Sequence, residues 1–253
     1  VLGGTKEGGG VRDGGGVRDR PHPWTMPSMD PSRRAQISPM PPGPFEPSPG
    51  YCHFGVSPGL NYAHDGVRMR LLIAITGASG SLYAQRLLDQ VAGGPHEVHV
   101  ILSQYAQAVL SHELPGGLRV HESVQQHGHR SMNLPFASGS NPPDAMVIIP
   151  CSMGTLGRIA HGVSSDALLR CADVMLKERR KLILVPRETP LSLIHVKNFE
   201  LLLQAGAVLL PANPGFYSRP RNVEEVVDTV VARVLDHLGI SHGLQARWME
   251  EPE

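Results

Sequence analysis

The chain has 253 residues, and its 23 Lys and Arg balance its 23 Asp and Glu, so the formal net charge at pH 7 is zero. This balance gives no electrostatic reason to expect a nucleic acid or an anionic membrane as a partner. No apolar run approaches the roughly 20 residues of a membrane span. The three cysteines are too few and too scattered for a disulfide framework or a zinc site. We therefore expect a protein of a reducing, cytoplasmic compartment.

The first 68 residues differ in composition from the rest. They hold 13 of the 28 glycines and 11 of the 23 prolines, and they contain the repeat GGGVRD-GGGVRDR. Such a segment buries too little apolar surface to offset its chain entropy. We predict that residues 1–68 are a disordered Gly/Pro-rich extension and that residues 69–253 form one compact domain. An organelle-targeting role for the extension is the weaker alternative, because acidic residues are mixed with its arginines.

Apolar strand patterns alternate with helical patterns from residue 70 to residue 238. The predicted strands are Arg70–Thr76, Glu97–Ser103, Met146–Pro150, Lys181–Pro186 and Ala207–Pro211. The predicted helices are Leu82–Val91, Gln104–Glu113, Ser165–Arg179, Leu191–Gly206 and Asn222–Leu238. The alternation implies an α/β fold with a doubly wound parallel sheet and helices on both faces, flavodoxin-like or otherwise Rossmann-type. Residues 114–143 carry little pattern, and we expect His127-Gly128-His129 to lie in a surface loop.

A glycine-rich loop, Gly77-Ala78-Ser79-Gly80, follows the first strand. Backbone N–H groups at the start of the next helix can hold a phosphate there, and a tight structural turn is the alternative. The loop lacks the G-x-G-x-x-G spacing of dinucleotide sites, and the second strand ends in Ser103-Gln104 rather than in a ribose-binding acid. Both features favour FMN over NAD or FAD.

The loop after the third strand, Cys151–Thr155, has a similar character. The hydroxyls of Ser152 and Thr155 could hydrogen-bond the edge of a planar ring, while Gly154 allows close backbone contact. A capped helix start is the alternative, and the motif alone favours it. We expect Cys151 to be a packing residue rather than a nucleophile.

Charged residues follow the fourth strand and lie on the helix before it. Arg187-Glu188 could form a salt bridge, or the carboxylate could pass a proton to a leaving phosphate. Arg170 and Lys177 are seven residues apart and therefore share a helix face. This face could be a solvated charged surface, or its two cations could bind one anion.

The C-terminal part of the chain adds two candidate phosphate ligands. Tyr217, in the loop after the fifth strand, could donate a hydrogen bond. Arg233 lies among apolar positions, so we expect a buried cation that needs a phosphate or a carboxylate as its partner. No D-D-x-x-D cluster occurs, so we expect no metal.

Several segments together carry a family resemblance. They are TGASGSLYAQRLL, ILSQYAQ, FASGSNPPDAMVIIPCSMGTL, ADVMLKERRKLILVPRETPLS, GAVLLPANPGFYSRP and ARW. By their order and spacing, residues 69–248 resemble the flavin prenyltransferase (UbiX) family, which implies that residues 69–253 are a flavin prenyltransferase domain. The resemblance implies that reduced FMN is alkylated by dimethylallyl monophosphate at N5 and then at C6. It also implies a homo-oligomer, a dodecamer with sites at subunit interfaces, and a UbiD-type decarboxylase that receives the prenylated FMN.

The resemblance also implies roles for individual residues. The implied FMN contacts are Gly77, Ala78, Ser79, Gly80, Ser103, Ser152, Met153, Gly154, Thr155 and Arg187. The implied ligands of dimethylallyl phosphate are Ser138, Arg170, Lys177, Tyr217 and Arg233. Glu188 resembles the family's phosphate-linked acid, and Glu113 resembles a second carboxylate that assists proton movement.

Three other functions compete on the same scaffold. Flavin-dependent cysteine decarboxylases carry P-A-S-A-N-T and P-x-M-N-x-x-M-W motifs, but this chain has FASGSNPP at the first position and lacks the second motif. A direct carboxy-lyase is another alternative. A non-catalytic FMN carrier would not need Glu188, Tyr217 and Arg233 together, so it is disfavoured.

Removal of residues 1–68 tests the predicted domain boundary. A chain that starts at Met69 should bind FMN and melt within a few degrees of the full-length chain, because the removed segment lacks the apolar pattern of a packing element. Differential scanning calorimetry and a flavin titration measure both properties. A large fall in melting temperature would show that the segment packs on the domain.

Overall fold

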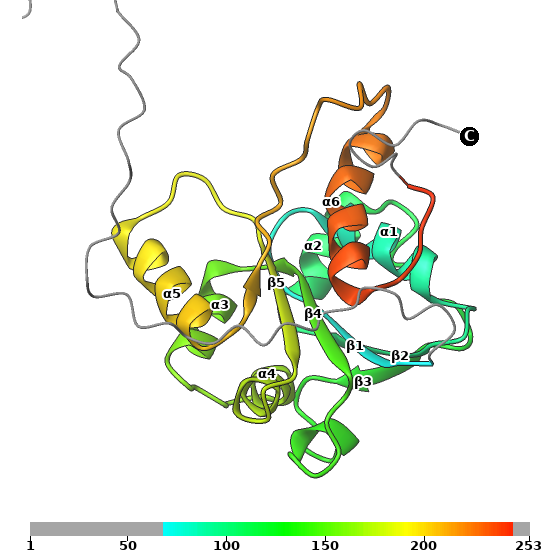
Figure 1. The fold of residues 1–253 in the computed structure, drawn as a ribbon. Helices are drawn as coiled ribbons and strands as arrows, with labels where there is room; N and C mark the ends of the chain where they lie inside the picture. The colour runs from blue at the N-terminus through cyan, green and yellow to red at the C-terminus, as the bar shows by residue number, and fades with distance from the viewer. Residues whose placement is uncertain (1–67, 245–253) are drawn as a thin grey trace, which may run out of the picture. The chain divides into compact units, whose positions relative to one another are not determined.

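A computed structural model describes residues 68–244, which contain a six-stranded parallel sheet covered by helices on both faces (Figure 1). The predicted extension, residues 1–68, lies outside the described residues except for Arg68, and so does the C-terminal ARW motif. The strands are β1 Arg70–Ile75, β2 Glu97–Leu102, β3 Gln125–Gly128, β4 Ala145–Cys151, β5 Lys181–Pro186 and β6 Val208–Leu209. The helices are α1 Ser81–Val91, α2 Ala106–Glu113, α3 Met153–Ala160, α4 Ala167–Lys177, α5 Leu193–Gln204 and α6 Val223–Leu238, with a short 3-10 helix η1 at Pro135–Ala137.

The strand order confirms the predicted doubly wound fold. The order is β3-β2-β1-β4-β5-β6, and every neighbouring pair is parallel. If the five predicted strands are numbered by themselves in chain order, they lie in the flavodoxin order 2-1-3-4-5. With β3 added at the edge, the six strands lie in the Rossmann order 3-2-1-4-5-6. The winding direction reverses between β1 and β4, which is where ligands bind in open sheets of this type.

The predicted strands and helices do not include β3, η1 or α3, although the sequence allows a capped helix start at Cys151–Thr155. β3 reads QQHG, without apolar alternation, and it is held at the edge by pairing with β2 and by a 2.9 Å hydrogen bond between His99 Nδ1 and His127 Nε2. The expectation of a surface loop at His127 was therefore wrong. α3 contains Gly154 and Gly157, which weaken a helical pattern.

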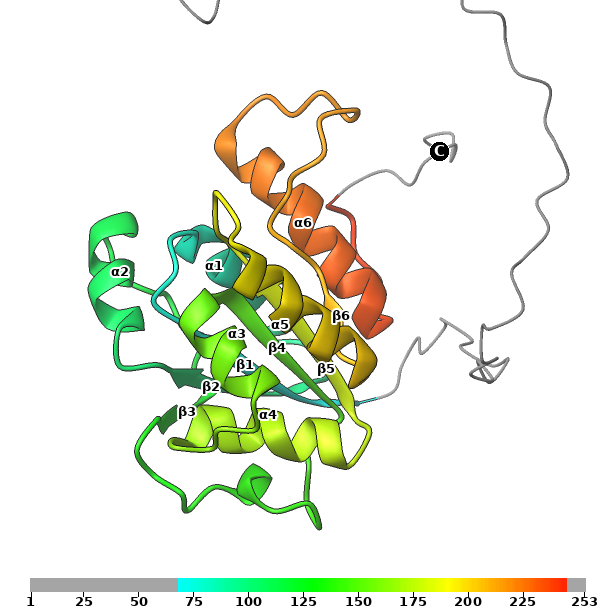
Figure 2. The same cartoon turned by 90° about the vertical axis from the view of Figure 1, so that its left-hand side faces the viewer.

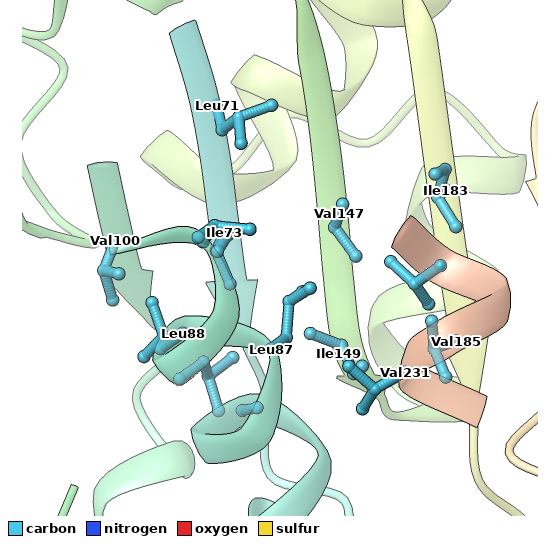
Figure 3. Close-up of a cluster of buried hydrophobic side chains, with 14 of the residues drawn as sticks. Leu71, Ile73, Leu87, Leu88, Val100, Val147, Ile149, Ile183, Val185 and Val231 are labelled. Atoms are coloured by element: carbon cyan, nitrogen blue, oxygen red, sulfur yellow. The ribbon is translucent and has the colours of Figure 1, made fainter. Parts of the chain in front are cut away.

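Two apolar cores separate the layers of the domain. Leu71 and Ile73 of β1 face one core and Leu72 faces the other, as the pleat of a strand requires. The first core packs the sheet against α1 and α6 (Figure 3). The second core packs it against α3, α4 and part of α5, on the side that faces the viewer in Figure 2.

A bidentate ion pair reinforces the first layer. Arg86 of α1 donates from Nε and Nη2 to the two carboxylate oxygens of Asp228 of α6, at 2.7 and 2.6 Å. The Asp228 side chain is only 9% exposed, so the pair is partly desolvated and its geometry is specific. No helix within residues 68–244 is long and apolar enough to cross a membrane.

Truncation of Leu87 tests the first core. This residue is fully buried between α1 and the sheet, so Leu87→Ala should lower the free energy of unfolding by about 2–5 kcal/mol. The matched control is Val223→Ala, since Val223 is 64% exposed and its truncation should cost less than about 0.5 kcal/mol. Urea denaturation measures both variants, and equal effects would contradict the described packing.

Candidate active site

A cavity of about 330 Å³ opens at the carboxyl ends of the first four strands. The loops that follow β1, β2, β3 and β4 each contribute to its wall. The lining residues are Gly77, Ser103, Gln104, Tyr105, His129, Arg130, Ser152, Thr155, Arg158, Ser165 and Asp166. Four of the predicted FMN contacts, Gly77, Ser103, Ser152 and Thr155, thus lie around one cavity at the point where the winding reverses.

Thr76 connects the two loops at the switch point. Its hydroxyl donates to the carbonyl oxygen of Pro150 at 2.7 Å and accepts from the backbone N–H of Ser152 at 2.7 Å. The side chain is 1% exposed, so both bonds are shielded from water. They hold the end of β1 and the start of α3 in one fixed arrangement.

Two glycines shape the loop after β1. A Cβ on Gly77 would lie 2.6 Å from Cβ of Tyr105, so only glycine lets this loop approach the loop after β2. Gly80 has a φ of +117°, a left-handed conformation in which a side chain is strained. The predicted phosphate loop is therefore also a structural turn.

Glu113 lies at the start of α1. Its Oε2 accepts the backbone N–H groups of Gly80 and Ser81 at 2.8 and 2.7 Å. Burial raises the pKa of the carboxyl group, but hydrogen bonds from Ser79, Ser81 and Gly80 outweigh burial and lower its pKa overall. A carboxylate thus occupies two of the amides that the sequence assigned to a phosphate, and it stabilises the positive end of the helix.

The start of α3 shows both alternatives that the sequence left open. Ser152 caps the helix by accepting from the Thr155 N–H at 3.3 Å, and its hydroxyl also donates to Thr155 Oγ1 at 3.1 Å. The same two residues line the cavity. Met153 is 8% exposed and packs in the second core. Burial raises the pKa of Cys151 to about 12, which fits a packing residue rather than a nucleophile.

The loop after β5 approaches the loop after β1. Arg187 donates from Nε to the carbonyl oxygen of Ser79 at 3.0 Å, so the two predicted FMN contacts lie together. Glu188 is exposed, and its Oε1 accepts only the adjacent Thr189 N–H at 3.0 Å among the contacts described. Within the described residues the salt-bridge alternative for Arg187 and Glu188 is not realised, and one carboxylate oxygen of Glu188 remains available to a ligand.

The five predicted ligands of dimethylallyl phosphate lie elsewhere, and none of them lines the cavity. Arg170 donates from Nε to the Ala137 carbonyl oxygen at 3.0 Å and from Nη1 to Asp173 at 2.7 Å. Lys177 forms an ion pair with Glu178, and both side chains pack against Gly139, next to Ser138.

The prediction that Arg233 is a buried cation was wrong. Its side chain is 60% exposed, and its Nη1 pairs with Asp236 Oδ2 at 2.7 Å, one helical turn away. The apolar neighbours in the sequence point into the first core, while Arg233 faces away from it. Tyr217 is also exposed, in the loop before α6.

Seven lining residues were not singled out as site residues from the sequence: Gln104, Tyr105, His129, Arg130, Arg158, Ser165 and Asp166. Gln104 and Tyr105 directly follow the predicted contact Ser103. Their position at the end of a strand could have identified them as site residues from the sequence. His129 and Arg130 follow the unpredicted strand β3, and Arg158 lies on the unpredicted helix α3. Within residues 68–244 no group of three or more His, Cys, Asp or Glu side chains is arranged to hold a metal ion.

The doubly wound sheet with a cavity at its switch point has the arrangement of nucleotide-binding α/β proteins. The family model described as Flavoprotein matches residues 60–235. Flavin prenyltransferase UbiX of Pseudomonas aeruginosa is 44% identical over 198 residues, covering 72% of this chain and 95% of the relative. Flavin prenyltransferase UbiX of Methanocaldococcus jannaschii is 43% identical over 182 residues, covering 71% and 98%. The chain therefore belongs to the flavin prenyltransferase UbiX family.

Two solved structures share the fold. AnUbiX (PadA1), in complex with FMN and dimethylallyl pyrophosphate, aligns with a TM-score of 0.69 at 38% identity, covering 74% of this chain and all of that one. A dodecameric FMN-dependent UbiX-like decarboxylase from Escherichia coli O157:H7 aligns with a TM-score of 0.68 at 39% identity, covering 72% and 100%.

The contact of Glu113 with α1 predicts a pH dependence of stability. Because the folded-state pKa of Glu113 is lowered, its contribution is complete above the ordinary glutamate pKa of about 4.3 and is lost as pH falls through the folded value. Glu113→Gln should be less stable than the parent at pH 7, and the difference should shrink below about pH 4. Urea denaturation across this range measures it, with the exposed Glu122→Gln as control. A difference that does not change with pH would contradict the described contact.

Proposed function

We propose that this protein transfers a dimethylallyl group from dimethylallyl monophosphate to N5 and then C6 of reduced FMN. The product, prenylated FMN, would serve a UbiD-type decarboxylase, and we place the reaction in the cytoplasm. The observation that carries the proposal is the cavity at the β1–β4 switch point, lined by four of the residues that the family resemblance assigns to FMN. The identity to UbiX enzymes over nearly their whole length supports it.

The residues around the cavity suit FMN as the prenyl acceptor. Ser103, Ser152 and Thr155 offer hydroxyl groups, and the first turn of α3 offers backbone N–H groups that no helical carbonyl can satisfy. The strand β2 ends without an acidic residue for an adenosine ribose. When bound, reduced FMN supplies the nucleophilic nitrogen and carbon that accept the prenyl group.

Glu188 supplies the proton that the leaving group needs. As the C–O bond of the dimethylallyl ester breaks, its electron pair stays on the phosphate oxygen, and protonation of that phosphate by Glu188 stabilises the products. The new C–N bond forms with release of the N5 proton, which is returned to the Glu188 carboxylate, so charge and atoms balance. The exposed carboxylate beside Arg187 fits this role because only one of its oxygens is held by Thr189.

The position of the phosphate ligands supports a homo-oligomeric site. Arg170, Lys177, Tyr217 and Arg233 do not line the cavity of their own chain. Exposed apolar side chains on α5, including Leu193 and Ile194 at 70%, offer a surface for a second copy. The dodecameric state of the E. coli relative agrees with this. We therefore propose that one protomer donates phosphate ligands to the cavity of another.

Replacement of Glu188 tests the mechanism. Glu188→Gln keeps the shape of the side chain, so FMN binding should be retained while prenyl transfer slows by roughly 10²–10⁴-fold. The assay incubates reduced FMN anaerobically with dimethylallyl monophosphate and a chelator, and mass spectrometry detects a five-carbon adduct. The diphosphate donor is run in parallel, with Glu122→Gln as the control variant.

Each outcome of this assay discriminates between functions. No adduct from the parent protein with either donor, together with tight FMN binding, would indicate a flavin carrier. Release of CO2 from an aromatic acid without a partner enzyme would indicate a direct carboxy-lyase. Full activity of Glu188→Gln would exclude Glu188 as the acid.

A further inference from the structure

Two arginines line the cavity without a role in the family resemblance. Arg158 lies on α3, one turn after Thr155, and Arg130 lies just after β3. They come from elements that are distant in sequence, and both line the same cavity as Ser103 and Ser152. Two guanidinium groups at one cavity are suited to bind an anion.

Arg158 is held in place by its neighbours. Its Nε donates to the Gly154 carbonyl oxygen at 3.1 Å, and its Nη2 lies 3.5 Å from Thr155 Oγ1. Its Nη1 lies 3.8 Å from Asp166 Oδ2. Asp166 is itself anchored, because its Oδ1 caps α4 by accepting the Leu169 N–H at 2.9 Å. The guanidinium is therefore oriented before any ligand binds, yet the side chain remains 44% exposed.

Arg130 has no hydrogen bond or ion pair to any residue of the described range. The charged side chains of the cavity are two arginines and one aspartate, so the lining carries an excess of positive charge. Three serines, Ser103, Ser152 and Ser165, belong to the same lining. A pre-oriented guanidinium, a second free guanidinium and several hydroxyls are the groups that bind a phosphate monoester.

Two backbone amides at the start of α1 already have an anionic partner. The Gly80 and Ser81 amides there hold the Glu113 carboxylate. A phosphate dianion beside that carboxylate would be repelled, whereas beside Arg158 and Arg130 it would be neutralised.

We infer that Arg158 and Arg130 bind a phosphate monoester dianion in this cavity, and that this is the phosphate of FMN. The inference rests on the proposed function, since it names the ligands of the acceptor's phosphate. The same chemistry would suit the phosphate of the prenyl donor, and the experiment separates the two sources.

The test compares FMN with riboflavin, which has the same ring and no phosphate. Flavin fluorescence titrations are run on full-length parent, Arg158→Gln, Arg130→Gln and Arg158→Lys. Loss of a charge-assisted hydrogen bond should weaken FMN binding by roughly 10- to 100-fold in each Gln variant, with riboflavin changed by less than about twofold. Arg158→Lys should be intermediate because it keeps the charge and loses the planar fork.

Two controls separate binding from folding. Arg119→Gln removes a 75% exposed arginine outside the cavity and should leave both flavin affinities unchanged. Asp166→Asn keeps an N-cap side chain for α4 but removes the charge that offsets Arg158, so FMN binding should be equal or tighter. If Arg158 served only to pair with Asp166, this variant would weaken both flavins as Arg158→Gln does, and the inference would be wrong.

The remaining outcomes decide the source of the phosphate. Equal weakening of FMN and riboflavin, or no weakening of either, would overturn the inference. An unchanged FMN affinity with a raised KM for dimethylallyl monophosphate would support the phosphate site and overturn its assignment to FMN. If the parent binds neither flavin, the proposed function fails, but calorimetric titration with inorganic phosphate still tests the site. A heat of phosphate binding that is present in the parent and lost in Arg158→Gln supports the site. No heat of phosphate binding from the parent refutes it.

Discussion

The reversal of winding between β1 and β4 is the constraint on which the rest of this structure depends. The loops after these two adjacent strands turn toward opposite faces of the sheet, so a space opens between them that neither helix layer fills. The buried hydroxyl of Thr76 joins the two loops with two hydrogen bonds of 2.7 Å. The helices that follow these loops, α1 and α3, pack in different cores. The packing of both cores therefore influences the shape of the cavity.

Charge within the site is arranged by backbone dipoles as much as by side chains. At the start of α1, Glu113 accepts the Gly80 and Ser81 N–H groups, so a carboxylate of the protein itself offsets the positive end of the helix dipole. The positive charge that faces the cavity instead comes from Arg130 and Arg158. The Glu113 carboxylate lies at the start of α1, outside the cavity lining, whereas both arginines belong to that lining.

The separation of the two predicted ligand groups has a topological reason. The predicted FMN contacts follow the ends of β1, β2, β4 and β5, whereas Arg170 and Lys177 lie along α4 as it runs back to the start of β5. Seven residues of helix place these two cations about 10 Å apart along the axis, and each is paired with a carboxylate of its own helix or helix end. A homo-oligomer offers a way to bring such a face to a cavity that its own chain cannot reach.

Much of this could be predicted from the sequence because it depends on local patterns. Consecutive residues carry the continuous apolar runs such as Leu71–Ile75, the 3.6-residue stripes of α1 and α6, and the turn chemistry at Gly77 and Ser152. These patterns determined the layer architecture and the family, and they placed four predicted FMN contacts at strand ends that share one edge of the sheet.

The tertiary structure alone decided the rest. β3 is a strand only because β2 and His99 pair with it, and α3 is a helix despite two glycines because Ser152 caps it and its apolar face packs in the second core. Arg233 lies among apolar residues in the sequence but faces solvent, since the helix period, not proximity along the chain, decides which side is buried. The sequence does not reveal that Arg130 and Arg158 line one cavity, because Arg130 follows β3 and Arg158 lies on α3, two elements absent from the predicted strands and helices. The sequence by itself therefore determined the fold and the uncharged lining residues that follow the predicted strands. The charged lining residues, Arg130, Arg158 and Asp166, were decided by the tertiary structure, because contacts between distant segments leave no local pattern in the sequence.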